Sequence, residues 1–84
     1  MHVTAELSLY PLQADYIPVI KGFIERLAAS GELTLVTNAM STQISGEAEQ
    51  VFSLVREALT ASHAQFGKQV LVCKFIPGLL SIRD

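Results

Sequence analysis

The sequence has only one cysteine, no concentrated group of basic residues and no long apolar run, and each shortage excludes a class of protein. A single cysteine, Cys73, cannot form an intramolecular disulfide, which excludes a disulfide-stapled secreted domain and leads us to expect the reducing cytoplasm. Nucleic-acid binding normally requires a concentrated basic surface, but the six basic residues are scattered along the chain. Every apolar run is shorter than the roughly 18 residues that cross a bilayer, so we expect no insertion into a membrane.

Half of the residues are hydrophobic, which is the composition of a folded globular protein. Eighty-four residues provide one hydrophobic core and no room for a second, so we predict a single domain over residues 1–84. A domain of this size buries only about 60–65 % of its unfolded surface and is marginally stable alone. Association of several copies is a common remedy.

The first half of the chain shows the pattern of a strand followed by a helix. Apolar and polar side chains alternate over residues 3–10, which is typical of a strand with one buried face. Asp15 then stands where a helix N-cap is expected, and Pro18 falls in the first turn, where its missing N–H costs no hydrogen bond. Apolar residues follow at spacings of three and four, which predicts an amphipathic helix over residues 16–29, ended by Gly31.

The second half of the chain predicts a hairpin, a second helix and a last strand. Residues 33–38 and 41–46 read as two strands joined too tightly for anything but a hairpin. Gly46 and Glu47 open the second helix and Gly67 ends it, and residues 69–76 form the last strand. This βαββαβ order predicts an α+β, ferredoxin-like sandwich. Both helices then lie on one face of a four-stranded antiparallel sheet, with the first and third strands at its centre.

The alternation within the strands divides the predicted sheet into an apolar face and a polar face. The apolar parity, which we expect against the helices, holds Val3, Ala5, Leu7, Leu9, Ile44, Leu71, Cys73 and Phe75. The opposite parity holds Glu6, Ser8, Tyr10, Asn38, Ser41, Gln43, Val72 and Lys74. This second face is too polar to be a core, so we expect it to meet a small ligand or another subunit.

Several activities of this fold require residues that are missing from the expected positions. The first loop, YPLQAD, lacks the thiolate pair of a metallochaperone, and the strand STQISG lacks an aromatic ring on which an RNA base stacks. No spacing suggests a catalytic triad, and we interpret His2 and His63 as surface residues and Cys73 as a core residue. We therefore predict a binding protein rather than an enzyme, with no metal and no cofactor.

The stretch TNAMSTQISGE, residues 37–47, carries small polar side chains where a plain strand would carry Val, Ile and Leu. Together with the first strand it offers what a planar polar heterocycle requires, an aromatic ring in Tyr10 and hydrogen-bonding groups. These groups belong to Ser8, Asn38, Ser41, Thr42 and Gln43. Glu6 and Asp15 add negative charge, although a salt bridge to Lys74 is the simpler explanation of Glu6 and a helix cap explains Asp15 equally well. The residues alone leave open a small-ligand site or an oligomerisation surface that contains Tyr10.

Two segments resemble signature blocks of the YkoF-type thiamine- and hydroxymethylpyrimidine-binding proteins. LSLYPLQADYIPVIKGF, residues 7–23, is similar to their strand–loop–helix block, and TNAMSTQISGEAEQVF, residues 37–52, to their Ser-Thr strand that ends in glycine before a helix. The opening AELS and the pattern Thr-x-x-Met-x-Thr-x-Ile-x-Gly-Glu also resemble the related single-domain thiamine-binding family. These matches cover about half of the chain.

The resemblance implies a ligand, thiamine or its hydroxymethylpyrimidine precursor, bound without catalysis in thiamine salvage or uptake. By position it assigns ligand contacts to Ser8, Tyr10, Asp15, Ser41 and Thr42. The polar face adds Glu6, Asn38 and Gln43, and Glu6 also belongs to the AELS block. Because YkoF-type proteins resemble two fused repeats and this chain has one, we expect a homodimer or homotetramer through the sheet face. A thiamine-precursor transporter is the further partner that the resemblance implies.

Two other functions compete with this interpretation. One is a ferredoxin-like dimerisation or regulatory module that uses the same face without a thiamine-type ligand. The other is a small dimeric α/β-barrel enzyme, whose acid–base candidates would be Glu6 and Lys74. A binding protein should show a rise in melting temperature when its ligand is added, whereas the dimerisation module should show none.

Overall fold

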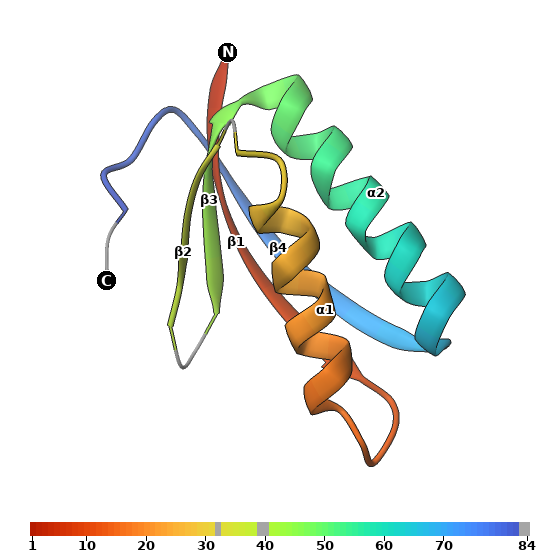
Figure 1. Cartoon of the computed structure of the whole chain (residues 1–84). Helices are drawn as coiled ribbons and strands as arrows, with labels where there is room; N and C mark the ends of the chain where they lie inside the picture. The colour runs from red at the N-terminus through yellow and green to blue at the C-terminus, as the bar shows by residue number, and fades with distance from the viewer. Residues whose placement is uncertain (32, 39–40, 83–84) are drawn as a thin grey trace.

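The computed structural model describes residues 1–31, 33–38 and 41–82, and it has the predicted βαββαβ order (Figure 1). The strands are β1 (His2–Pro11), β2 (Thr34–Thr37), β3 (Thr42–Glu47) and β4 (Gln69–Pro77), and the helices are α1 (Ile17–Ala28) and α2 (Ala48–Phe66). The sheet is antiparallel in the order β2-β3-β1-β4, so β1 and β3 lie at its centre as predicted. Both helices lie on one face of the sheet, which confirms the ferredoxin-like sandwich. In these residues no helix is long and apolar enough to cross a membrane.

The core lies between the sheet and the two helices. Its buried members alternate along the central strands or recur on one side of each helix: Val3, Ala5, Leu7 and Ile44 from the sheet, and Val19, Phe23, Leu27, Val51, Val55 and Ala58 from the helices. The predicted apolar parity is therefore confirmed for β1 and β3. It weakens along β4, where Phe75 is exposed because β4 is an edge strand. Phe75 instead stacks on Phe52 of α2, with 4.5 Å between ring centroids.

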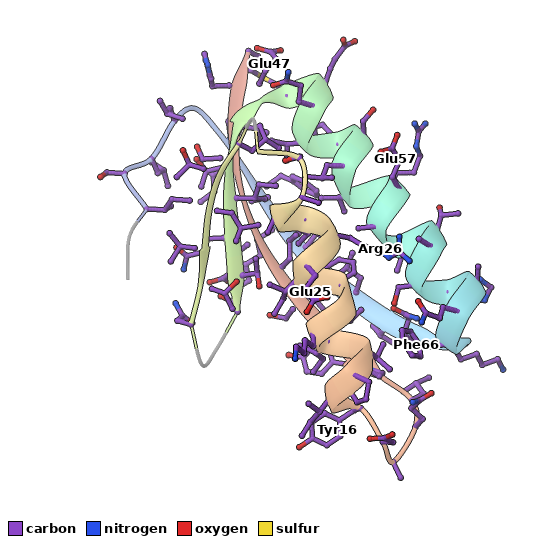
Figure 2. The ribbon with its side chains drawn as sticks, in the orientation of Figure 1. Tyr16, Glu25, Arg26, Glu47, Glu57 and Phe66 are labelled. Carbon is purple, nitrogen blue, oxygen red and sulfur yellow. The ribbon has the colours of Figure 1, made fainter. Side chains whose placement is uncertain are left out.

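The predicted starts of both helices are wrong by one or two residues (Figure 2). α1 begins after Tyr16, so Asp15 is not the N-cap, and no side chain caps this end. Gly46 does not open α2, because it continues the β3 ladder opposite Val3 of the long strand β1. Glu47 is then the N-cap of α2. Gly67 ends α2 as predicted, with a φ of +88° that favours glycine.

The segment after β4 folds back across the sheet face opposite the helices, which we call the open face (Figure 1). The buried hydroxyl of Thr4 holds it, since it donates to the Gly78 carbonyl at 3.1 Å and accepts the Leu80 N–H at 3.0 Å. The Thr4 hydroxyl also lies 3.2 Å from the Ser45 hydroxyl, which is its third hydrogen-bond contact. A hydroxyl has one donor and two acceptor positions, so Ser45 donates and every position of Thr4 is used.

Gly46 lies so close to Leu33 that an added methyl group has no room. A Cβ built on Gly46 collides with the Cδ2 methyl of Leu33, which packs against the core. We expect Gly46→Ala to lower the free energy of unfolding by about 1–2 kcal/mol, because Leu33 must shift. Gly22→Ala is the matched control, since a Cβ there lies 3.9 Å from its nearest neighbour and alanine favours the helix. Chemical denaturation measures both, and equal effects would contradict the packing role of Gly46.

Replacing Thr4 with valine keeps the shape of the side chain and removes the hydroxyl that binds the C-terminal segment. We expect Thr4→Val to lower the free energy of unfolding by about 1–3 kcal/mol, because buried partners lose their hydrogen bonds. The Leu80 amide should also exchange faster with solvent, which hydrogen-exchange NMR measures. Thr34→Val, an exposed substitution in the same row of the sheet, is the control. Unchanged exchange at Leu80 would contradict this account of how the segment is held.

Candidate functional site

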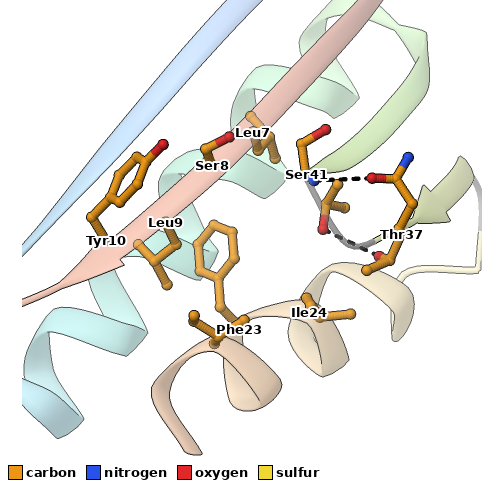
Figure 3. Close-up of a pocket in the computed structure, with 11 residues that line it drawn as sticks. Leu7, Ser8, Leu9, Tyr10, Phe23, Ile24, Thr37 and Ser41 are labelled. Carbon is orange, nitrogen blue, oxygen red and sulfur yellow. Dashed lines mark hydrogen bonds between the residues drawn. The ribbon is translucent and has the colours of Figure 1, made fainter. Parts of the chain in front are cut away.

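A cleft opens where β1 continues beyond the start of β3. The ladder between them ends at Leu7 opposite Thr42, whereas β1 runs on beside β4 to Pro11. The β2–β3 hairpin and α1 border the resulting gap, which has a volume of about 150 Å³ (Figure 3). Its polar lining includes Ser8, Tyr10, Asn38, Ser41 and Thr42. Its apolar lining includes Ile20, Phe23 and Ile24 of α1.

The hairpin that forms one wall is closed by its own polar side chains. The Asn38 N–H donates to the Ser41 carbonyl at 3.0 Å, and the Ser41 N–H donates to Asn38 Oδ1 at 3.1 Å. The hydroxyls of Thr37 and the buried Thr42 are 3.1 Å apart, within hydrogen-bond distance. These contacts fix the loop end of the hairpin beside the cleft. Part of the polar stretch at residues 37–47 is therefore needed for the hairpin itself. Ala39 and Met40 lie outside the described residues.

A charged row borders the cleft on the open face. Gln43, Glu6 and Lys74 face one another across three strands. Glu6 Oε1 lies 3.6 Å from Lys74 Nζ, which confirms the predicted salt bridge, and Glu6 Oε2 accepts a hydrogen bond of 3.1 Å from the Ser41 hydroxyl. Both carboxylate oxygens of Glu6 thus have a partner. The salt bridge between Glu6 and Lys74 is exposed to solvent, so it contributes little to the stability of the fold. Glu6 positions Ser41 at the rim of the cleft.

The structure brings together most of the sequence-predicted contact residues. Five of them line the cleft: Ser8, Tyr10, Asn38, Ser41 and Thr42. Ser8 and Tyr10 project from β1 away from α1, so their side chains border the cleft on its open-face side (Figure 3). Glu6 and Gln43 lie one row further along the same face. Asp15 is exposed in the loop before α1 and does not line the cleft, and its carbonyl accepts a hydrogen bond from Gln13 Nε2. Ligand contact by these residues stays a prediction.

Sequence reasoning missed the apolar side of the cleft. Ile20 and Ile24 were interpreted only as members of the apolar stripe of the predicted helix, and Phe23 was given no role there. Phe23 is buried, but Ile20 and Ile24 are only partly buried. The spacing of apolar residues is the same for a core position and for the wall of a cleft. No signal in the sequence distinguishes the two without the length of β3.

The remaining chemically reactive side chain, Cys73, lies on the helix side of β4. Burial raises the pKa of its thiol, so the thiol stays protonated and is a poor nucleophile at neutral pH. In the part of the chain that the structure describes, no three His, Cys, Asp or Glu side chains gather as metal ligands do.

Comparison with known proteins identifies relatives of this fold. A protein of Streptococcus pneumoniae is 25 % identical and superposes with a TM-score of 0.83 over 93 % of this chain and 88 % of its own. A protein of Thermotoga maritima, provisionally assigned to thiamine biosynthesis or salvage, is 22 % identical and has a TM-score of 0.85 over 98 % of this chain and 91 % of its own. None of the curated proteins matches. The model of the YkoF-related family matches residues 2–76, and the chain therefore belongs to that family.

Proposed function

We propose that this protein binds thiamine or its hydroxymethylpyrimidine precursor in the cleft beside β1 and catalyses no reaction. Membership of the YkoF-related family supports a thiamine-related role, as does the fold that it shares with the Thermotoga maritima protein. The observation that carries the proposal is the cleft itself. It gathers five of the eight predicted contact residues, although they come from two distant segments of the chain.

The lining suits a flat, polar ring. On one side Ile20, Phe23 and Ile24 offer apolar surface to the face of a heterocycle. On the other side the phenol of Tyr10 and the hydroxyls of Ser8 and Ser41 offer an aromatic surface, donors and acceptors. A 4-aminopyrimidine has an apolar face and a polar edge, so both sides of the cleft are complementary to it.

The volume favours one ring over two. Clefts that enclose a drug-sized ligand measure about 300–1,000 Å³, whereas this cleft measures about 150 Å³. The pyrimidine fills such a space, and the thiazolium ring of thiamine would extend toward the open face, where Glu6 lies at the rim. The nearby cation, Lys74, already pairs with Glu6, so a phosphate ester gains no free positive charge there. We therefore propose the unphosphorylated compounds as ligands.

Association of two copies belongs to the same proposal. On the open face β4 presents an apolar row, interrupted by Lys74, in which Val70, Val72 and Ile76 are each nearly half exposed. A second copy that covers this row would also border the cleft, because Val70 pairs with Tyr10 and Val72 with Ser8. We propose a cytoplasmic homodimer formed in this way, which passes its ligand to other proteins of thiamine uptake or salvage. The same apolar row also favours the competing function, a dimerisation module without ligand.

Isothermal titration calorimetry with hydroxymethylpyrimidine and with thiamine tests the proposal. We expect binding of both, and Tyr10→Ala should weaken it about tenfold because an aromatic contact with the ring is lost. Ser41→Ala should weaken it about fivefold through the loss of one hydrogen bond. Asp15→Ala is the control that should change nothing, because Asp15 lies outside the cleft.

Two results would count against this function. The absence of heat and of any change in melting temperature with both ligands, from a folded protein, would favour the dimerisation module. Binding that survives Tyr10→Ala and Ser41→Ala but is lost in Asp15→Ala would move the site to the loop before α1.

A further inference from the structure

The hydrogen-bond pattern of β1 determines which of its main-chain groups face β3 and which face β4. In an antiparallel ladder, residues that exchange hydrogen bonds with one neighbour alternate with residues that point to the other. The Leu12 N–H donates to the Lys68 carbonyl, and the Gly78 N–H donates to the His2 carbonyl. Even-numbered residues of β1 therefore bond to β4. The odd-numbered residues face β3, as the bond from the Ala48 N–H to the Met1 carbonyl confirms.

Leu9 is the odd-numbered residue that follows the last described pair, Leu7 with Thr42. Its N–H and C=O point away from β4 and toward the cleft, which Leu9 lines. Among the residues that the structure describes, neither group has a hydrogen-bond partner. The next odd residue, Pro11, has no N–H to offer. Leu9 thus presents one donor and one acceptor side by side on a rigid central strand.

We infer that the main-chain N–H and C=O of Leu9 form the recognition edge of the cleft for a heterocycle that carries an amino group next to a ring nitrogen. This inference rests on the proposed function for its choice of ligand and adds the group that selects it. In a 4-aminopyrimidine, N3 accepts from the Leu9 N–H while the 4-amino group donates to the Leu9 carbonyl. Both groups of the strand and both groups of the ring edge are then satisfied.

The same arrangement fixes the orientation of the ring. A heterocycle that bonds to a strand edge lies close to the plane of the sheet, because the main-chain groups lie in that plane. One ring face then meets Phe23 and Ile24 of α1, and the other meets the open-face side near Ser8 and Tyr10. In a 4-oxo pyrimidine N3–H is a donor and O4 is an acceptor, the reverse of a 4-aminopyrimidine. Such a ring can pair with Leu9 only after it turns over, and its 5-substituent then points to the opposite end of the cleft.

Amide NMR of the labelled protein tests the inference directly. In the free protein we expect the Leu9 amide to exchange with solvent faster than those of Leu7 and Tyr10, which bond to neighbouring strands. Addition of 4-amino-5-hydroxymethyl-2-methylpyrimidine, or of the fragment 4-aminopyrimidine at millimolar concentration, should move the Leu9 amide proton downfield and slow its exchange. A Leu9 amide that is protected in the free protein, or that neither compound moves, would overturn the inference.

Ligand analogues and one pair of variants provide the energetic test. The analogue without the 4-amino group should bind about tenfold more weakly or worse, because the Leu9 carbonyl is left without its donor. Leu9→Pro removes the N–H without breaking a bond to β4 and should weaken binding to a similar extent, whereas Leu9→Ala keeps the main chain and should weaken it less. Equal affinity for the amino and deamino compounds would contradict the inference even if the proline variant does not fold.

These outcomes separate the inference from the proposed function. Calorimetric binding of hydroxymethylpyrimidine with an unmoved Leu9 amide would support the function and refute the recognition edge. A Leu9 amide that responds to 4-aminopyrimidine, in a protein that binds neither hydroxymethylpyrimidine nor thiamine, would support the edge and refute the function.

Discussion

The cleft exists because one central strand of the sheet is longer than the other. β1 has ten residues and β3 has six, and the two ladders of β1 therefore end at different places. The far end of β1 pairs with β4 on one edge, and its other edge lies beside the cleft. Because a central strand is fixed by core packing at Leu7 and by β4, the cleft is built on a rigid element.

The polar residues of the central hairpin serve two purposes. Thr37 bonds to Thr42, and Asn38 bonds to the main chain of Ser41, which together hold the end of the hairpin. The Ser41 hydroxyl links the hairpin to Glu6 across the sheet. Thr4 and Ser45 form a second polar pair on the open face, where Thr4 binds the C-terminal segment. The open face is therefore covered at one end by the chain itself and open at the other end, where the cleft lies.

Local patterns predicted the elements and the faces of the sheet, but not the ends of the elements. The alternation of Val3, Ala5 and Leu7 is set by burial on one face, so it is readable from the sequence. Gly46 looked like a helix start, yet its pairing with Val3 keeps it in β3, and this pairing joins residues far apart in the chain. The cleft also depends on contacts between residues that are far apart in the chain, which local patterns do not predict. Side chains of the cleft were found by their polarity, whereas its apolar wall and the main chain of Leu9 carry no sequence signal.

A crystal structure of the protein grown with saturating hydroxymethylpyrimidine would show directly whether the cleft binds the ligand. We expect density for one flat ring in the cleft between Phe23 and the β2–β3 hairpin, with Ser8 or Ser41 within hydrogen-bond distance and its amino edge against β1. A ring bound elsewhere, whether on the apolar row of β4 or in the loop around Asp15, would contradict the proposed site, as would an empty cleft at saturating ligand.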